Sequence, residues 1–395
     1  MTANRTLSFL LAILLIAPVR AQDKPSKDAY EFTTVKTLKV TPVKNQNRSG
    51  TCWSFSTLAL IEAELLRTGK GEYDLSEMFV VHHSYADKAR KYVRLQGHGN
   101  FAGGGSFYDV LYVLKHYGIV PEAAMNGLRY GEEGHVHGEL DAAAKAYVEA
   151  VVKNPNRALT PVWFDGFKGI LDAYLGAIPE RFTFDGKDYS PASFMASLGV
   201  DPDDYVSLTS FTHHPFYARF AIEIPDNWRW SESYNLPLDE LMSVIDYSIE
   251  QGYTVAWGSD VSEKGFSRDG IAVVPDVNLA DMSDSDQARW LGLPQRARDS
   301  VLYAGKPGYE KPITQAIRQQ AFDSQQTTDD HGMLIYGTAT DQQGKKYYTV
   351  KNSWGETGQY KGHWYASEAF VQYKTINIVV HKDAIPPAIR KKAGL

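Results

Sequence analysis

The sequence has little of several features that mark particular classes of protein. Cysteine occurs 1 time in 395 residues, so an internal disulfide is excluded. Positive charge is not in excess, because 41 lysines and arginines face 47 acidic residues, and this argues against a nucleic-acid-binding surface. The sequence has no repeat of fixed period and no low-complexity segment. Hydrophobic residues make up 43% and charged residues 22%, the composition of a globular chain long enough to bury a large core.

Long apolar runs are scarce as well, and the clearest one lies at the N-terminus. Arg5 precedes the apolar segment Leu7–Pro18, and Val19 and Ala21 place aliphatic or small residues at the positions that a signal peptidase reads. This pattern is typical of a cleaved secretory signal peptide, because the run is shorter than the roughly 20 apolar residues that cross a bilayer. We therefore expect a signal peptide at residues 1–21 and an exported protein, periplasmic or secreted, without stable membrane insertion. The alternative is an uncleaved N-terminal anchor.

Export makes the single cysteine, Cys52, unusual, because exported proteins usually pair their thiols or lack them. One explanation is a buried cysteine that acts as a small hydrophobic residue. The other is a reactive thiol. From Thr51 to Arg67 apolar residues recur every three or four positions, which predicts a helix with Cys52 at its N-terminus. The partial positive charge of a helix N-terminus favours the thiolate, which is the nucleophilic form.

The two halves of the chain differ in their hydrophobic period. Helical patterns dominate the front half, and the segment at about 127–235 alternates helix-like stretches with Pro/Gly/Asp-rich connectors. β-rich runs bounded by Gly, Asp and Asn follow in the back half, at residues 253–258, 332–340, 347–351 and 375–381. These patterns predict an α+β protein with a helical lobe, an antiparallel β-rich lobe and a large helical insertion at about 127–235.

Four further residues complete a set that Cys52 needs for acyl transfer. His331 opens a β-rich run, so its imidazole has a rigid base from which to exchange a proton with the thiol. Asn352 offers an amide that can hold the imidazole in one tautomer, and Trp354 beside it can exclude water from that hydrogen bond. Gln46, in the loop before the cysteine, can donate to the oxyanion of a tetrahedral intermediate together with the Cys52 backbone N–H.

The segments around these residues resemble those of the papain superfamily of cysteine peptidases. Gln46–Phe55 is similar to its nucleophile loop, Leu75–Glu77 to its post-helix motif, and Asn352–Gly355 to its asparagine motif. Gly104 and Gly105 are similar to the glycines whose backbone receives an extended substrate. The motifs occur in the family's order and span residues 42–365. The resemblance implies a two-lobed papain-like fold with the cleft between the lobes, and a Cys–His–Asn triad that cleaves peptides without a cofactor.

The distance along the chain from Cys52 to His331 exceeds the roughly 130–150 residues usual for papain and the cathepsins. Segments at 117–121, 234–238 and 252–261 resemble the bleomycin hydrolase and aminopeptidase C branch. That resemblance implies an aminopeptidase with peptide substrates, a C-terminal tail that lies in the cleft, and assembly into a homo-oligomer. The tail at residues 386–395 is basic and lacks the ending typical of the branch, which weakens the exopeptidase inference.

Three other functions remain open on this evidence. They are an endopeptidase of the same fold, a catalytically silent peptide-binding protein, and acyl transfer to an amine instead of water. Asp330, next to the histidine, is a candidate for contact with substrate, with a solvated loop carboxylate as the alternative. The histidine pairs at residues 82–83, 135–137 and 213–214 lack a third ligand at zinc-like spacing, so we expect no metal site.

Overall fold

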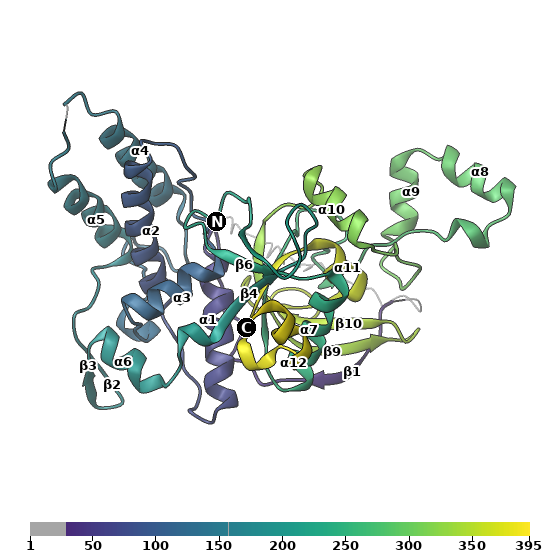
Figure 1. Cartoon of the computed structure of the whole chain (residues 1–395), viewed down its shortest axis with the longest axis horizontal. Helices are drawn as coiled ribbons and strands as arrows, with labels where there is room; N and C mark the ends of the chain where they lie inside the picture. Colours follow the sequence, from purple (N-terminus) through teal and green to yellow (C-terminus); the bar gives the residue numbers. More distant parts are fainter. Residues whose placement is uncertain (1–28, 157) are drawn as a thin grey trace, which may run out of the picture.

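The computed structural model describes residues 29–156 and 158–395. The predicted signal peptide, residues 1–21, lies outside this part of the chain and stays a prediction. Within it a helical lobe and a β-rich lobe lie side by side, and helix α1 (Cys52–Arg67) lies between them (Figure 1). Among the described residues, no helix is both long enough and apolar enough to cross a membrane.

The helical lobe is built from amphipathic helices that bury their apolar sides against α1. Leu58 of α1, Phe79 of the next helix and Val110 of the one after it belong to one hydrophobic core. Ser76 caps its helix by accepting a hydrogen bond from the Phe79 N–H. The helices of this lobe besides α1 are α2 (Glu77–Arg94), α3 (Phe107–His116), α4 (Gly138–Val152), α5 (Val162–Leu175) and α6 (Pro191–Leu198).

The β-rich lobe is organised by one ten-stranded sheet in the order β5-β6-β4-β12-β7-β9-β10-β11-β8, with β1 paired to β9. All pairings are antiparallel except β4 with β6 and β8 with β11. The strands are β1 (Phe32–Thr37), β4 (Tyr205–Thr209), β5 (Arg219–Ala221), β6 (Glu232–Asn235), β7 (Val255–Ser259), β8 (Ile271–Ala272), β9 (His331–Asp341), β10 (Lys346–Lys351), β11 (His363–Ser367) and β12 (Thr375–His381). This arrangement is the α+β fold with a mostly antiparallel sheet that the sequence predicts.

Helices also cover the β-rich lobe. Apolar residues of α7 (Leu238–Glu250) and α12 (Pro387–Ala393) belong to a second core, together with the centre of the sheet. Two more helices, α10 (Gln315–Asp323) and α11 (Glu368–Lys374), lie at one end of the sheet in Figure 1. By contrast, α8 (Asp284–Gly292) and α9 (Gln295–Leu302) extend away from the rest and contain no buried residue.

The segment predicted as a helical insertion, residues 127–235, has a mixed structure. It contains α4, α5 and α6, which belong to the helical lobe, and a small hairpin of β2 (Phe182–Phe184) and β3 (Lys187–Tyr189). From residue 205 onward it consists of strands and loops, and β4, β5 and β6 extend the main sheet. The strands of this second part could not be recognised in the sequence, because each is only three to five residues long.

A buried ion pair supports the segment that leads into β9. The Lys374 ammonium contacts Asp260 at 3.1 Å and Glu263 at 2.9 Å and donates to the Gln326 carbonyl at 2.6 Å. Lys374 and Asp260 are almost fully buried. Removing one partner of such a pair leaves an uncompensated charge in the interior.

We expect Lys374→Met to lower the free energy of unfolding by about 3–5 kcal/mol, because it leaves Asp260 buried without its cation. The matched control is Lys115→Met, which removes an exposed ion pair with Asp203 and changes that free energy by about 1 kcal/mol or less. Urea unfolding of the three proteins measures both changes. Equal effects of the two substitutions would contradict the importance of the buried pair.

Candidate active site

Cys52 is the first residue of α1 and lies in a pocket between the two lobes. The backbone N–H groups of Gly332 and Trp53 point at its sulfur. Gly332 allows this closeness, since a Cβ at that position would lie 2.6 Å from the Ser56 Oγ in α1. The pocket is lined by Cys52, Trp53, Gly105, Ser106, Phe107, Ile224, Asp226, Gly258, Asp329, Asp330, His331, Gly332 and Asn377. The fold therefore brings the predicted nucleophile and the predicted histidine into one pocket.

The imidazole of His331 is held by Asn352 and covered by Trp354. His331 Nε2 lies 2.7 Å from Asn352 Oδ1, and both residues are buried. The same Oδ1 accepts from the Ser353 backbone N–H at 2.7 Å, which identifies it as the amide oxygen. His331 Nε2 therefore carries the proton and Nδ1 is free to take one from the thiol. The Trp354 ring stacks on the imidazole with centroids 4.6 Å apart.

Gln46 is buried and tied to the asparagine loop. Its Oε1 accepts from the Ser353 Oγ at 2.6 Å, and its Nε2 donates to the Ser49 carbonyl at 2.8 Å. The Gln46 backbone N–H donates to the Ser353 carbonyl at 2.8 Å, so the nucleophile loop and the asparagine loop pair directly. Among the described residues, the bond to Ser49 is the only one that the Gln46 amide nitrogen makes, which leaves its second N–H for an oxyanion. Gln46 itself does not line the pocket around Cys52.

Burial favours the neutral forms of both the Cys52 thiol and the His331 imidazole. It raises the pKa of Cys52 to about 12, and the negative charges of Asp329 and Asp226 add to this effect. Burial lowers the pKa of His331 to about 4, although the hydrogen bond that His331 donates to Asn352 and the charge of Asp330 act in the opposite direction. The helix N-terminus and the backbone N–H groups of Gly332 and Trp53 act in the opposite direction, toward the thiolate.

The two glycines and Asp330 differ in their surroundings. Gly105 lines the pocket, and a Cβ there would lie 2.8 Å from the Trp53 ring. A Cβ on Gly104 would lie 2.0 Å from the Asp226 carboxylate, so Asp226 covers the position that we predicted for substrate backbone. Asp330 also lines the pocket, but its carboxylate accepts from the backbone N–H groups of residues 261 and 262 and from the hydroxyl of residue 328. These bonds hold the loop after β7, and contact of Asp330 with substrate stays a prediction.

Sequence reasoning missed two pocket carboxylates, Asp226 and Asp329. Asp226 lies in the loop between β5 and β6, and no periodic pattern or motif marks that loop. Asp329 is the first of two aspartates before His331, and only its neighbour Asp330 was singled out. The adjacency to the histidine was a usable signal for Asp329, whereas nothing local could have pointed to Asp226.

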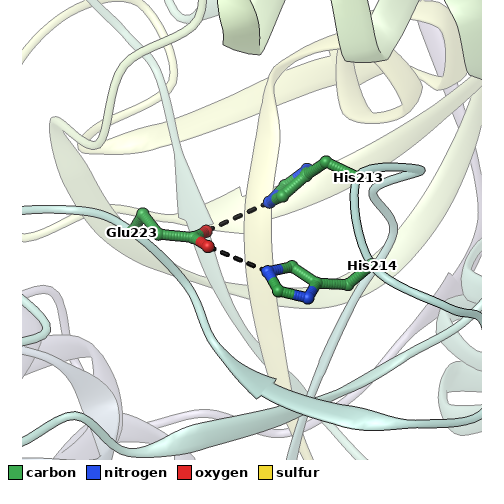
Figure 2. Close-up of side chains that lie close together, drawn as sticks. All are labelled: His213, His214 and Glu223. Atoms are coloured by element: carbon green, nitrogen blue, oxygen red, sulfur yellow. Dashed lines mark hydrogen bonds and ion pairs between the residues drawn. The ribbon is translucent and has the colours of Figure 1, made fainter.

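A second polar cluster consists of His213, His214 and Glu223 (Figure 2). The two Nε2 atoms lie 3.0 and 2.9 Å from the Glu223 oxygens. The Gln319 Oε1 accepts from the Thr212 N–H, so its amide nitrogen is the group that faces His213 Nδ1 at 3.0 Å. Nδ1 of His213 is therefore an acceptor and Nε2 carries the proton, which it donates to Glu223. These hydrogen bonds account for the arrangement of the three side chains.

Comparison with known proteins agrees with this geometry. The family described as "Papain family cysteine protease" matches residues 27–156, and the one described as "Peptidase C1-like family" matches residues 308–394, together more than half of the chain. Aminopeptidase G of Lactobacillus delbrueckii subsp. lactis is 23% identical over 86% of this chain and 80% of its own. Aminopeptidase C of Streptococcus thermophilus is 23% identical over 92% and 85%.

A solved structure is similar over most of the chain. A crystal structure of pepw from Lactobacillus rhamnosis HN001 superimposes with a TM-score of 0.68 at 19% identity, covering 92% of this chain and 84% of its own. At this identity the likeness concerns the fold. Together with the two family matches and the full-length relatives, it shows that the chain is a cysteine-type peptidase that belongs to the papain superfamily, in the branch of bleomycin hydrolase and aminopeptidase C.

Proposed function

We propose that the protein hydrolyses peptide bonds with Cys52 as nucleophile and His331 as general base and acid. The observation that carries the proposal is the pocket that contains both side chains, with His331 Nε2 held at 2.7 Å from Asn352 Oδ1. This hydrogen bond leaves Nδ1 as the proton acceptor. The thiol proton passes to Nδ1, and the Cys52 thiolate, paired with the His331 imidazolium, attacks the carbonyl carbon of the peptide bond.

The reaction then follows two acyl-transfer steps. The sulfur bonds to the carbonyl carbon, and the resulting oxyanion accepts from the Cys52 backbone N–H and the free N–H of Gln46. The imidazolium of His331 protonates the leaving amine as the carbon–nitrogen bond breaks, which leaves a thioester on Cys52. Water then loses a proton to His331 and attacks the thioester, and the thiol takes that proton back when the carboxylic acid leaves.

We further propose that the protein is an aminopeptidase, as its relatives are named. The C-terminal tail gives this proposal no support, because α12 packs on α7 and its residues do not line the Cys52 pocket, where the resemblance to the branch led us to expect the tail. Selection for a free N-terminus therefore has to come from another part of the cleft. Export after cleavage near Ala21 is part of the proposal and rests on the N-terminal sequence alone.

Cys52→Ser tests the nucleophile with little change of shape. We expect the rate of hydrolysis to fall by about 10⁴-fold or more, because a hydroxyl of much higher pKa replaces the thiol. Iodoacetamide should add one carbamidomethyl group to the unmodified protein and none to the variant, as seen by intact-mass spectrometry. The thermal unfolding curve of the variant is the control for folding. A variant that keeps full activity would refute the mechanism.

A pair of substrates separates an aminopeptidase from an endopeptidase. Both substrates have the same short fluorogenic peptide sequence, and they differ only in that one has a free N-terminus and the other an acetylated one. We expect rapid stepwise release of N-terminal residues from the first and at least about tenfold slower cleavage of the second, since acetylation removes the charge that an exopeptidase recognises. Mass spectrometry of the products identifies the bonds cut. Fast internal cleavage of the acetylated peptide would establish the endopeptidase instead.

Export is tested by the mature N-terminus. When the full chain is expressed in a bacterium with a secretory pathway, the protein recovered from the periplasm or medium should begin near Gln22. N-terminal sequencing reads this directly, and replacing Leu11 and Leu14 with Arg, which breaks the apolar run, should keep the protein in the cytoplasm. Protein recovered in the membrane fraction with an intact N-terminus would support the uncleaved anchor.

A further inference from the structure

The pocket around Cys52 contains two carboxylates that the mechanism above does not use. We propose that Asp226 and Asp329 bind the α-ammonium group of the substrate and thereby select peptides with a free N-terminus. This inference rests on the proposed aminopeptidase function and names the part of the protein that determines its specificity.

Asp226 is held firmly in the pocket. Its Oδ1 accepts from Asn100 Nδ2 at 2.9 Å, and its carboxylate lies directly over Gly104. The loop that carries it is clamped to the helical lobe two and three residues further on. Trp228 Nε1 and Arg229 Nε donate to the two carboxylate oxygens of the buried Asp109, at 3.0 and 2.6 Å. The carboxylate of Asp226 is therefore presented by a rigid loop, as a selective binding group must be.

Asp329 has no hydrogen-bond donor among the described residues. Asp329 is partly buried, and burial together with the charges of Asp226 and Asp330 raises its pKa to about 7. A carboxylate in such a pocket loses part of its hydration, and no hydrogen bond from a described residue compensates for that loss. Such a group is stabilised by a cation that enters the pocket, and this is the feature that points to a positively charged ligand.

Among the residues that the structure describes, no cationic side chain makes an ion pair or a hydrogen bond with either of these two carboxylates. The nearest ammonium is that of Lys88, which is buried and lowers the pKa of Asp226. Its hydrogen bonds, however, go to the backbone carbonyls of Ala102 and Gly104. Arg229 is engaged by Asp87 and Asp109. The charges that face the pocket therefore leave an excess of negative charge beside Cys52.

The position of this negative charge suits an α-ammonium. In the N-terminal residue of a peptide, the ammonium nitrogen is two bonds from the carbonyl carbon that the thiol attacks. The charges of both Asp329 and Asp226 act on the Cys52 sulfur, so both lie near it. The open space among the lining residues is about 30 Å³, room for roughly two or three water molecules. That space accommodates an ammonium group.

Binding of an ammonium group also affects the thiol. The two carboxylates contribute to the raised pKa of Cys52, second to burial and opposed by the Gly332 N–H. A bound cation compensates their charge and so favours the thiolate when substrate is in place. An acetylated N-terminus provides no such charge. A peptide with a free N-terminus therefore favours the thiolate that attacks it, and an acetylated peptide does not.

Asp226→Asn and Asp329→Asn test the proposal with nearly unchanged shape, because an asparagine at 226 can still accept from Asn100. For the free-amine peptide we expect KM to rise by about tenfold or more in each variant, the loss of one charged hydrogen bond. The ratio of kcat/KM for free over acetylated peptide should fall by a similar factor. Asp226→Glu should restore part of the selectivity. The matched control is Asp203→Asn on the surface, which should change neither value.

Alkylation of Cys52 distinguishes a binding role from a structural one. Without substrate, iodoacetamide should react faster with both variants than with the unmodified protein at mildly alkaline pH, because removal of a nearby anion lowers the thiol pKa. A damaged pocket would lose reactivity and activity together. Unchanged selectivity in both variants, with activity still dependent on Cys52, would refute the binding of the substrate ammonium by Asp226 and Asp329. It would not contradict the proposed peptidase function. If the unmodified protein cleaves neither peptide in a Cys52-dependent way, the proposed function is overturned, and the role of the two carboxylates with it.

Discussion

The close packing of α1 against β9 is the contact on which the site depends. It is possible because residue 332 is glycine, since a Cβ there would lie 2.6 Å from the Ser56 Oγ and 2.9 Å from the Phe107 ring. The start of the helix carries Cys52 and the start of the strand carries His331, so this packing brings the two into one pocket. A second contact fixes the relative position of the loops, because Gln46 pairs with Ser353 through both its backbone and its side chain.

The same packing determines the charge state of the site. A thiol and an imidazole that are enclosed together lose the water that would stabilise their ions, so burial favours the neutral pair in both cases. The helix N-terminus and the Gly332 N–H oppose this effect. Negative charges from Asp329 and Asp226 strengthen it. The pocket is thus arranged to respond to a cation, and reactivity depends on what the pocket contains.

Sequence and structure agree where the signal is local. The helical period after Cys52, the β-rich run after His331 and the Asn352–Trp354 pair each depend on neighbours in the chain, and each could be predicted from them. The anchoring of Gln46 by Ser353 could not, because the two residues come from opposite ends of the chain. The direction of the thiol pKa shift also could not, because it is set by side chains that fold over the sulfur from distant segments. The position of Asp226 beside Cys52 could not be predicted either, because it too depends on segments that are distant in the chain.

The C-terminal tail shows why the choice of the free N-terminus falls to side chains in this protein. Ile389 and Ala393 of α12 are buried in the core beside α7, and Lys392 pairs with Glu240 of that helix. The tail is therefore an amphipathic helix docked on the β-rich lobe, and its apolar residues would lose their burial if it moved into the cleft. The Asp226 carboxylate needs no such movement. Asn100 donates to it, and the loop that carries it is bound to Asp109 through Trp228 and Arg229. Its position is part of the folded lobe, so selection for an ammonium group is built into a single chain.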